Sequence, residues 1–284
     1  MNKCTPNTTS HESCWAEDVV GAFASLFRGR SDAWGAITGN CIEETVASSH
    51  YYIHLEGRGS LGIYPLLDDS TCCWATADLD QAGTAPWHYG PDDAGPALAV
   101  IVGLAHCGVD QGVFLEKTKS KGWRVWLFFS DAIAASDARH LVATAIEKAG
   151  LPPSIEIFPK QNTFDRIRFG NYVHLPYFGG GPSGNRPGRV MVDLAILIPI
   201  PLLDFLRDAH PFSVGAMQLV LDNLPRREPA EKGNNSLESV TEVLTRPLRI
   251  GERRPTLVRI AGHLRSRGIA ENVAVALLLP WVAM

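Results

Sequence analysis

The chain has 284 residues, is 45% hydrophobic and 20% charged, and carries a formal net charge of −4. This composition excludes a collagen-like chain, a largely disordered one and a small disulfide scaffold, and the length suffices for one or two globular domains. The charge is uneven: residues 1–111 sum to −10, 112–190 to +5, 191–245 to −4 and 246–284 to +5. The two basic blocks favour an anionic partner despite the acidic total.

The acidic first part of the chain predicts two helices and two strands. Residues 17–29 are amphipathic and end near a glycine, which predicts a short helix. Residues 51–56 and 71–80 are rich in β-branched and aromatic side chains, which predicts strands. Residues 94–108 predict a second helix, although a proline and a glycine lie within them.

The basic block that follows begins with a predicted hairpin. Residues 113–117 and 123–129 have strand character and flank the turn sequence TKSKG. Residues 136–150 predict a helix, since apolar side chains recur at helical spacing and a glycine follows the last turn. Two further strands are predicted at residues 154–158 and 171–175. Together these elements predict an α+β fold, a sandwich built on a largely antiparallel sheet.

The predicted domains are a mixed core over residues 1–190, a helical connector and linker over 191–236, and a small all-helical domain over 237–284. The chain ends in LLLPWVAM, and this apolar end would suit packing on more protein, so we expect either a truncated chain or a partner such as a helicase. The N-terminus has no secretory signal, and the apolar stretch 190–206 is interrupted by aspartates and prolines. A cytoplasmic protein without a membrane span is therefore expected.

Three carboxylates form a candidate metal site. Asp78 and Asp80 are two residues apart at the end of a predicted strand, so they project from one face of it. Glu156 lies between two isoleucines on another predicted strand and joins them if the two strands are neighbours. Such a set could hold two Mg²⁺ or Mn²⁺ ions for phosphoryl transfer. Taken alone, the D-x-D pair favours two solvated acids at a strand end.

The basic hairpin turn is a candidate phosphate site. Ser120 and Lys121 lie in the turn, and Arg124 begins the following strand. Lysine and arginine supply positive charge for phosphates, and a serine hydroxyl donates a hydrogen bond. Strand alternation places Arg124 on one face with Trp126 and Phe128, and a buried arginine requires an anionic partner. The alternative is an ordinary solvated turn.

A glycine-rich run at residues 57–62 matches the pattern GxGxxG but does not predict a dinucleotide site. Such a site needs the glycines to open a helix whose N-terminus faces the pyrophosphate. Here the run continues into Ile63-Tyr64-Pro65, which favours extended backbone and prevents a helix from starting nearby. The chain also lacks the phosphate-loop and hydrolase-elbow patterns.

Three runs in one order carry a family resemblance: HLEGRGSLGIYPLLDDSTCCWATADLD, then FLEKTKSKGWRVWLFF, then SIEIFPKQ followed by FGNYVHLPYFG. Over roughly residues 50–180 the chain resembles the archaeo-eukaryotic primase superfamily, in particular the primase-polymerases of phages, plasmids and mobile defence systems. The tail GERRPTLVRIAGHLRSRGIAENVAVALLL is similar to the helical primase C-terminal domain. The resemblance implies a core with an RRM-like antiparallel half flanked by helices, followed by a small helical domain.

The resemblance also implies roles for the candidate residues. Asp78, Asp80 and Glu156 would be the catalytic, metal-binding acids, with glutamate in place of the commoner aspartate at the third position. The family's second motif usually ends in a histidine that contacts the triphosphate, whereas here Arg124 stands in that place. Arginine is always charged and bidentate but cannot shuttle protons at neutral pH. We expect a functional variant of the nucleotide clamp, with Lys160 as a weaker contributor; weakened chemistry is the alternative.

The function expected from these residues is template-directed nucleotidyl transfer by a DNA primase-polymerase, with Mg²⁺ or Mn²⁺ as cofactor. Its partners would be single-stranded DNA, a primer and dNTP or NTP, in phage or mobile-element replication. The basic blocks would track the template through its phosphates, so binding would weaken with salt. Two alternatives remain open: a metal-dependent nuclease that uses the same acids, and a non-catalytic nucleic-acid-binding module.

Overall fold

The computed structural model describes residues 15–80, 93–119, 122–164, 169–180 and 189–225. Contacts divide the chain into two compact units, Met1–Leu224 and Pro225–Met284. The predicted helical domain over 237–284 lies outside the described residues, so the fold described below is that of the first unit.

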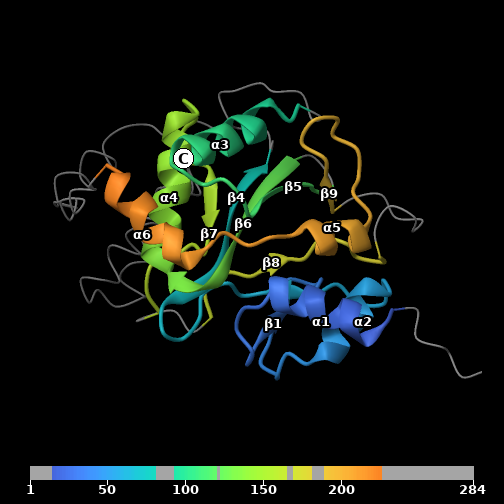
Figure 1. Cartoon of the computed structure of the whole chain (residues 1–284). Coiled ribbons are helices and arrows are strands. Elements are labelled where there is room, and N and C mark those ends of the chain that lie inside the picture. Colours follow the sequence, from blue (N-terminus) through green and yellow to red (C-terminus); the bar gives the residue numbers. More distant parts are fainter. Residues whose placement is uncertain (1–14, 81–92, 120–121, 165–168, 181–188, 226–284) are drawn as a thin grey trace, which may run out of the picture. The chain divides into compact units, whose positions relative to one another are not determined.

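The first unit contains six described helices and nine described strands (Figure 1). The helices are α1 (Glu17–Leu26), α2 (Ser48–Leu55), α3 (Gly95–His106), α4 (Ala135–Lys148), α5 (Leu202–Asp208) and α6 (Val214–Asn223). The strands are β1 (Trp34–Gly35), β2 (Cys41–Ile42), β3 (Gly62–Ile63), β4 (Thr71–Asp80), β5 (Val113–Lys117), β6 (Gly122–Ala134), β7 (Glu156–Phe158), β8 (Val173–His174) and β9 (Val190–Val192).

The strands form two sheets. The larger has the order β7-β4-β6-β5-β9, and the smaller has the order β2-β1-β3-β8. Every pairing between these named strands is antiparallel. The α+β class and the largely antiparallel sheet are therefore confirmed, as is the predicted hairpin, which joins β5 to β6.

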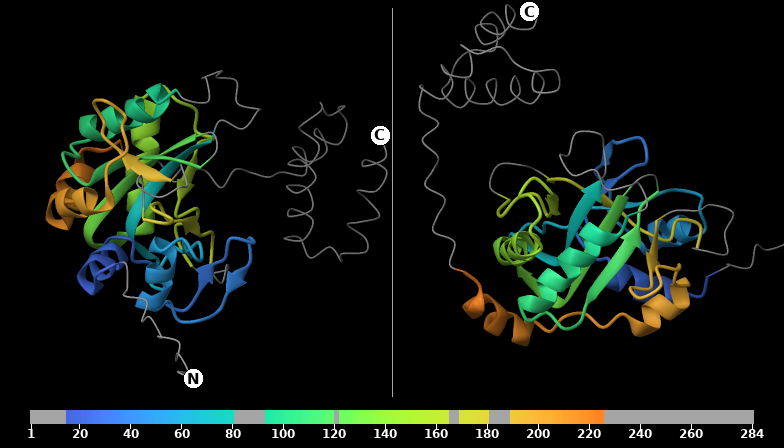
Figure 2. Two further views of the ribbon diagram at one scale, coloured as in Figure 1. Left: turned by 90° about the vertical axis from the view of Figure 1, so that its right-hand side faces the viewer. Right: turned by 90° about the horizontal axis from the view of Figure 1, so that it is seen from above.

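The two faces of the larger sheet have different neighbours. Figures 1 and 2 show α3 and α4 on one face and the N-terminal helices α1 and α2 on the other side of the sheet. Alternation along β4 sends Ala75, Ala77 and Leu79 into the core beneath α3 and α4, while Trp74 belongs to the second core. We call these the helix face and the aromatic face of the sheet.

The helix face is covered because α4 presents an apolar stripe at helical spacing. Its buried side chains include Ala138, Leu141, Val142 and Ala145. A glycine in α3, Gly103, allows the two helices to approach closely: a Cβ at that position would lie 2.3 Å from the Ala145 carbonyl oxygen. This contact explains why a helix with a glycine in its middle still forms here.

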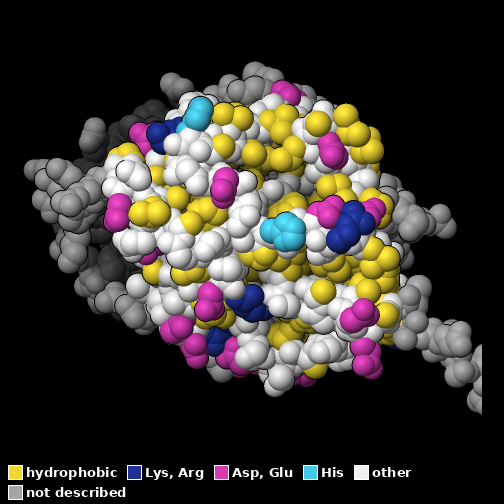
Figure 3. Space-filling view, in the orientation of Figure 1, with side chains coloured by type: hydrophobic (Ala, Val, Ile, Leu, Met, Phe, Trp, Pro, Cys, Tyr) yellow, Lys and Arg dark blue, Asp and Glu magenta, His cyan; other side chains and the backbone are white. Residues whose placement is uncertain are grey.

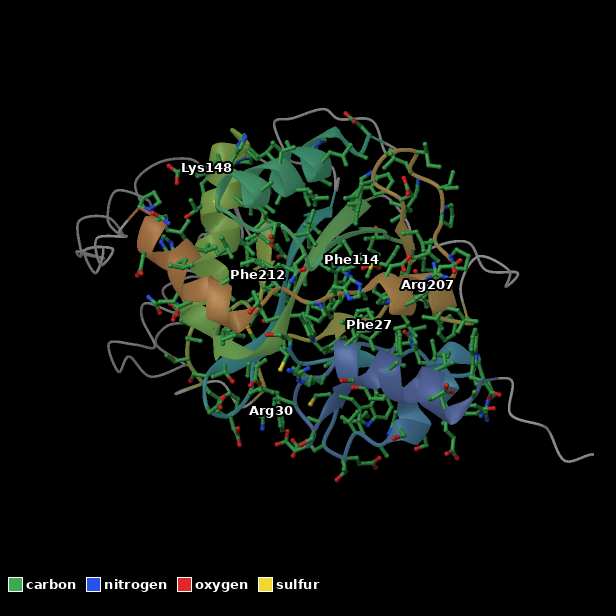
Figure 4. The ribbon with its side chains drawn as sticks, viewed as in Figure 1. Phe27, Arg30, Phe114, Lys148, Arg207 and Phe212 are labelled. Atoms are coloured by element: carbon green, nitrogen blue, oxygen red, sulfur yellow. The ribbon has the colours of Figure 1, made fainter. Side chains whose placement is uncertain are left out.

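The aromatic face packs on α1, α5 and the smaller sheet through large rings. Phe27, which follows the last residue of α1, lies edge-on to Trp126 and Phe128 of β6, with ring centroids 5.1 Å apart in both pairs. Phe114 of β5 lies edge-on to Phe205 of α5 at 5.0 Å. Figure 4 shows Phe27 and Phe114 within this layer. Edge-to-face pairs of this kind stabilise a core beyond the area that they bury.

One predicted element is wrong in type. Residues 51–56 were expected to form a strand, but the structure has helix α2 there. Its buried side chains are Tyr51, His54 and Leu55, a spacing of three and four that fits a helix with one buried side. The Ala47 backbone N–H donates to Nδ1 of His50 at 3.0 Å, which satisfies a donor at the start of the helix. The aromatic content of the run concealed this pattern.

The first compact unit extends beyond the predicted core of residues 1–190. β9 is an edge strand of the larger sheet, and α5 and α6 bury Leu202, Phe205, Met217 and Val220 in its two cores. The unit therefore includes most of the segment expected to be a connector. None of the helices in the described part of the chain is both long and apolar enough to span a bilayer.

Candidate functional site

Four ionisable side chains come from directly opposed positions on four neighbouring strands. Glu156 on β7 is opposite Asp78 on β4, Asp78 is opposite Arg124 on β6, and Arg124 is opposite Glu116 on β5. Directly opposed residues project from the same face of a sheet. The register therefore builds a row of carboxylate, carboxylate, guanidinium and carboxylate on the aromatic face.

Arg124 bridges two carboxylates in this row. Its Nη2 donates to Oδ2 of Asp78 at 2.5 Å, and its Nη1 donates to Oε2 of Glu116 at 3.3 Å. The side chains of Arg124 and Asp78 are 12% and 10% exposed. This is the anionic partner that a buried arginine was expected to need, and the partial burial makes these charge-assisted contacts stronger than surface ion pairs.

Glu116 is the most deeply buried member of the row. It is 0% exposed, and its Oε2 also accepts a hydrogen bond from Nε1 of Trp126 at 2.7 Å. Burial raises the pKa of the Glu116 carboxyl, and the charge of Arg124 acts in the opposite direction. Since both donors belong to the neighbouring strand β6, this carboxylate is held in a fixed position.

Glu156 lies at the exposed end of the row. Its side chain is 57% exposed, and Nζ of Lys160 lies 2.9 Å from its Oε1. Arg139 of α4 anchors the backbone of this strand, because its Nη1 donates to the carbonyl of Ile157 at 3.2 Å and also to that of Pro159. The sequence analysis grouped Glu156 with Asp78 on the condition that their two strands are neighbours. The pairing of β7 with β4 meets this condition.

The oxygen donors suit a divalent cation. Oδ1 of Asp78 is buried and accepts no hydrogen bond from the described residues, and Glu156 on the next strand presents a second carboxylate. Asp80 follows Asp78 by two positions on β4, and its backbone pairs with Gly122. The side chains that the structure describes include no cluster of three or more metal-ligating groups. The side chain of Asp80, the third carboxylate predicted from the sequence, is not among them.

A family match covers the residues of this arrangement. A profile described as "TOTE conflict system, Archaeo-Eukaryotic Primase domain" matches residues 38–186, more than half of the chain. The chain belongs to this family. No curated protein matches the sequence.

All four residues of the row lie within the residues that match the primase domain. The superfamily of this domain is of the nucleotidyltransferase type. The resemblance inferred from the three sequence runs is thus confirmed at the level of the superfamily. The two-sheet α+β architecture agrees with it. Asp78, Glu156, Arg124 and Lys160, predicted from segments far apart in the sequence, are brought together by the register of β4, β6 and β7.

Two of the predicted residues in the primase domain, Ser120 and Lys121, lie outside the described residues. Lys119, just before them, is exposed. On the face of the molecule shown in Figure 3, basic side chains are few and are scattered among acidic ones. The described residues of that face therefore offer no basic patch for a phosphate chain.

The sequence did not single out Glu116 or His174. Arg189 is largely buried, and burial lowers the pKa of its guanidinium while Glu116 opposes the shift. Burial, followed by the charges of Arg189 and Arg124, lowers the pKa of His174 to about 4. His174 lies in the run FGNYVHLPYFG that carries part of the family resemblance. Glu116 carried a weaker signal, a lone acid within an apolar strand.

Proposed function

We propose that the primase domain catalyses template-directed nucleotidyl transfer, either the synthesis or the extension of primers on single-stranded DNA. The observation that carries this proposal is the row formed by Glu156, Asp78 and Arg124 on three adjacent strands. Two acids beside a phosphate-binding cation are what a reaction between a hydroxyl and a nucleoside triphosphate requires. Membership of a primase family supports the same chemistry.

Asp78, Asp80 and Glu156 are the residues that would hold divalent metal. Oδ1 of Asp78, which is buried and accepts no hydrogen bond from the described residues, and the opposed carboxylate of Glu156 fit this purpose. Carboxylate oxygens are the ligands that Mg²⁺ and Mn²⁺ prefer. When bound, the metal supplies Lewis-acid activation of the 3′-hydroxyl and charge neutralisation at the triphosphate.

Arg124 of the row and Lys160 beside it would bind the triphosphate. Arg124 can contact two phosphate oxygens at once, and Lys160 lies next to Glu156 with its side chain 33% exposed. Ser120 and Lys121 of the hairpin turn are further candidates. In the transfer, a bond forms between the 3′-oxygen and the α-phosphorus, and the bond from that phosphorus to the departing pyrophosphate breaks. These side chains hold the pyrophosphate in line with the attacking oxygen.

The nucleic-acid partner would be bound through phosphates by the basic blocks at residues 112–190 and 246–284, which each sum to +5. Arg189 belongs to the first block and lies near the row, since Glu116 and Asp78 affect the pKa of its guanidinium. Binding of this kind is predicted to weaken steeply with salt.

The deciding experiment is an assay with a labelled primer on a single-stranded template, supplied with dNTPs or NTPs and either Mg²⁺ or Mn²⁺. We expect the labelled strand to lengthen. Asp78→Ala should abolish the lengthening, while Asp131→Ala, a change of an exposed carboxylate at the far end of β6, should not.

Each alternative has its own outcome in the same assay. Shortening of the labelled strand that depends on Asp78 would show a nuclease. Template binding that survives Asp78→Ala, with no incorporation by the parent protein under any metal, would show a non-catalytic binding module. De novo priming is then tested by omitting the primer.

A further inference from the structure

The guanidinium of Arg124 is hydrogen-bonded to Asp78, which is a candidate metal ligand. Nη2 of Arg124 is 2.5 Å from Oδ2 of Asp78, so one oxygen of this carboxylate is already bound to a cation. A divalent ion on the same carboxylate would share it with that guanidinium. Two cations on one carboxylate repel each other, and at low exposure water screens that repulsion weakly. Metal binding and the contact between Arg124 and Asp78 therefore oppose each other.

The same guanidinium has a second, better protected anion. Nη1 of Arg124 contacts Glu116, whose carboxylate is 0% exposed and fixed by Nε1 of Trp126 at 2.7 Å. When Arg124 leaves Asp78, Glu116 keeps it at the site. Its released nitrogen then becomes available to a phosphate oxygen, the strongest kind of partner for an arginine.

Cations offset part of the negative charge of this site. Among the described side chains, Asp78, Glu116 and Glu156 are matched against Arg124 and Lys160, and Arg189 lies close enough for Glu116 and Asp78 to affect its pKa. This offset weakens the attraction of the carboxylates for a divalent ion. A triphosphate reverses this balance, because it adds negative charge and withdraws Arg124 from Asp78.

We propose that Arg124 exchanges Asp78 for the triphosphate of the incoming nucleotide, with Glu116 as the positioning residue that holds its guanidinium, so that divalent metal and nucleotide bind cooperatively. This inference rests on the proposed function in assuming that the ligands are a nucleoside triphosphate and Mg²⁺ or Mn²⁺. Linkage requires the effect to be reciprocal: each ligand tightens the binding of the other by the same factor.

The first test measures Mn²⁺ binding to the nucleotide-free protein by electron paramagnetic resonance of the free ion. The full-length parent should bind Mn²⁺ weakly. Arg124→Gln removes the competing cation, and we expect it to tighten Mn²⁺ binding by about tenfold or more, which corresponds to about 1.4 kcal/mol. Arg207→Gln is the matched control, since Arg207 also contacts two carboxylates, Asp204 and Asp208, but on the exposed surface of α5.

The second test isolates Glu116 with a double-mutant cycle. Glu116→Gln keeps the acceptor for Trp126 but removes the charge that competes with Asp78 for Arg124. Arg124 then binds Asp78 more firmly, and we expect Mn²⁺ binding to weaken about threefold to tenfold. In the Arg124→Gln background the same change should alter Mn²⁺ binding less than about twofold, because Glu116 acts through Arg124.

The third test measures the coupling itself by calorimetric titration with dATP, with and without Mn²⁺. Chelation of Mn²⁺ by the triphosphate is the same in every sample and cancels between variants. The gain in dATP affinity that Mn²⁺ confers should be smaller in Arg124→Gln than in the parent, by at least about fivefold. Tryptophan fluorescence and thermal unfolding show whether each variant is folded.

Unchanged or weaker Mn²⁺ binding in folded Arg124→Gln overturns the exchange. An equal effect of Glu116→Gln in both backgrounds overturns the positioning role. Neither readout requires incorporation of nucleotide, so both stand apart from the primer assay. A protein that shows this coupling but extends no primer would retain the exchange and lose the polymerase assignment.

Discussion

The two faces of the larger sheet use the same strands for different purposes. On the helix face, β4 contributes Ala75, Ala77 and Leu79 to a core closed by apolar side chains of α3 and α4. On the aromatic face, the alternate positions include the buried Trp74 and the charged Asp78. A single strand thus holds the structural core on one side and the ionic row on the other.

This division explains how the ionic row is kept rigid. Side chains on the helix face fix β4 and β6 in register, and the register alone brings Asp78, Arg124 and Glu116 into line. The aromatic residues that precede the row exclude water from its inner end, where Glu116 is fully buried. Changes on the two faces should therefore separate stability from activity.

The largest effect is expected from Asp78→Asn on the aromatic face. The amide keeps the size of the side chain but removes the charge that would ligate metal and pair with Arg124. We expect incorporation of dNTP to fall by at least about 1000-fold, about 4 kcal/mol in transition-state stabilisation, while the protein stays folded. Primer extension together with circular dichroism measures both quantities. Loss of folding in this variant would mean that the two faces are not separable.

Leu141→Ala on the helix face should give the opposite result. Leu141 of α4 is 0% exposed, and its truncation leaves a cavity beneath the helix. The free energy of unfolding should drop by about 3–4 kcal/mol, as measured by denaturant titration. At a temperature where the variant is fully folded, its KM for dNTP should equal that of the parent. A large change in KM would show that packing on the helix face reaches the row.

The elements of these two faces also show how much of the fold could be predicted from the sequence. The strand-like composition of residues 71–80 and 123–129 predicted β4 and β6, and alternation along the second run placed Arg124 on the same face as Trp126. The helical spacing of residues 136–150 predicted α4, and its closing glycine, Gly150, has the positive φ of 68° that such a position requires. The spacing in α4 is unambiguous because that helix buries one side, whereas β4 and β6 are buried on both faces and were recognised by their composition.

Other features depended on tertiary contacts that no local pattern encodes. The helix α2 was mistaken for a strand because aromatic residues suit both, and burial against α1 decides between them. The pairing of Asp78 with Glu156 follows from β7 adding to the edge of β4, which the sequence presented only as a condition. Glu116 escaped notice because a buried acid is recognised only once its partners Arg124 and Trp126 are placed.

Acid should destabilise the aromatic face through His54. This side chain is 0% exposed; its Nδ1 accepts from the Leu61 backbone N–H and its Nε2 contacts the Pro176 carbonyl. Burial lowers its pKa to about 4 from the ordinary 6.5. Between these values the unfolded chain binds a proton that the folded protein excludes. The contribution of His54 to the free energy of unfolding is therefore fully present above about pH 6.5. It falls by about 1.4 kcal/mol for each unit that the pH is lowered, so that about 3 kcal/mol is lost by pH 4.

Chemical denaturation at several pH values between 4 and 8 measures this loss. His174, whose pKa is also lowered to about 4, adds a contribution of the same sign. His54→Gln should be less stable at pH 8 yet show a shallower dependence between pH 6.5 and 4. An unchanged slope in that variant would assign the acid sensitivity to other groups.

The smallest effect on stability is expected at the exposed end of the row, from Lys160→Gln. Lys160 and Glu156 form a pair with side chains 33% and 57% exposed, and solvated pairs of this kind contribute little. The free energy of unfolding should change by less than about 0.5 kcal/mol. The KM for dNTP should still rise about three- to tenfold, because the lysine supplies charge to the triphosphate. Steady-state extension kinetics and thermal unfolding distinguish these effects, with Lys148→Gln at the exposed end of α4 as the control.

A stability loss as large as that of Leu141→Ala would place Lys160 in the packing of the sheet. An unchanged KM would limit the triphosphate contacts to Arg124 and the hairpin turn.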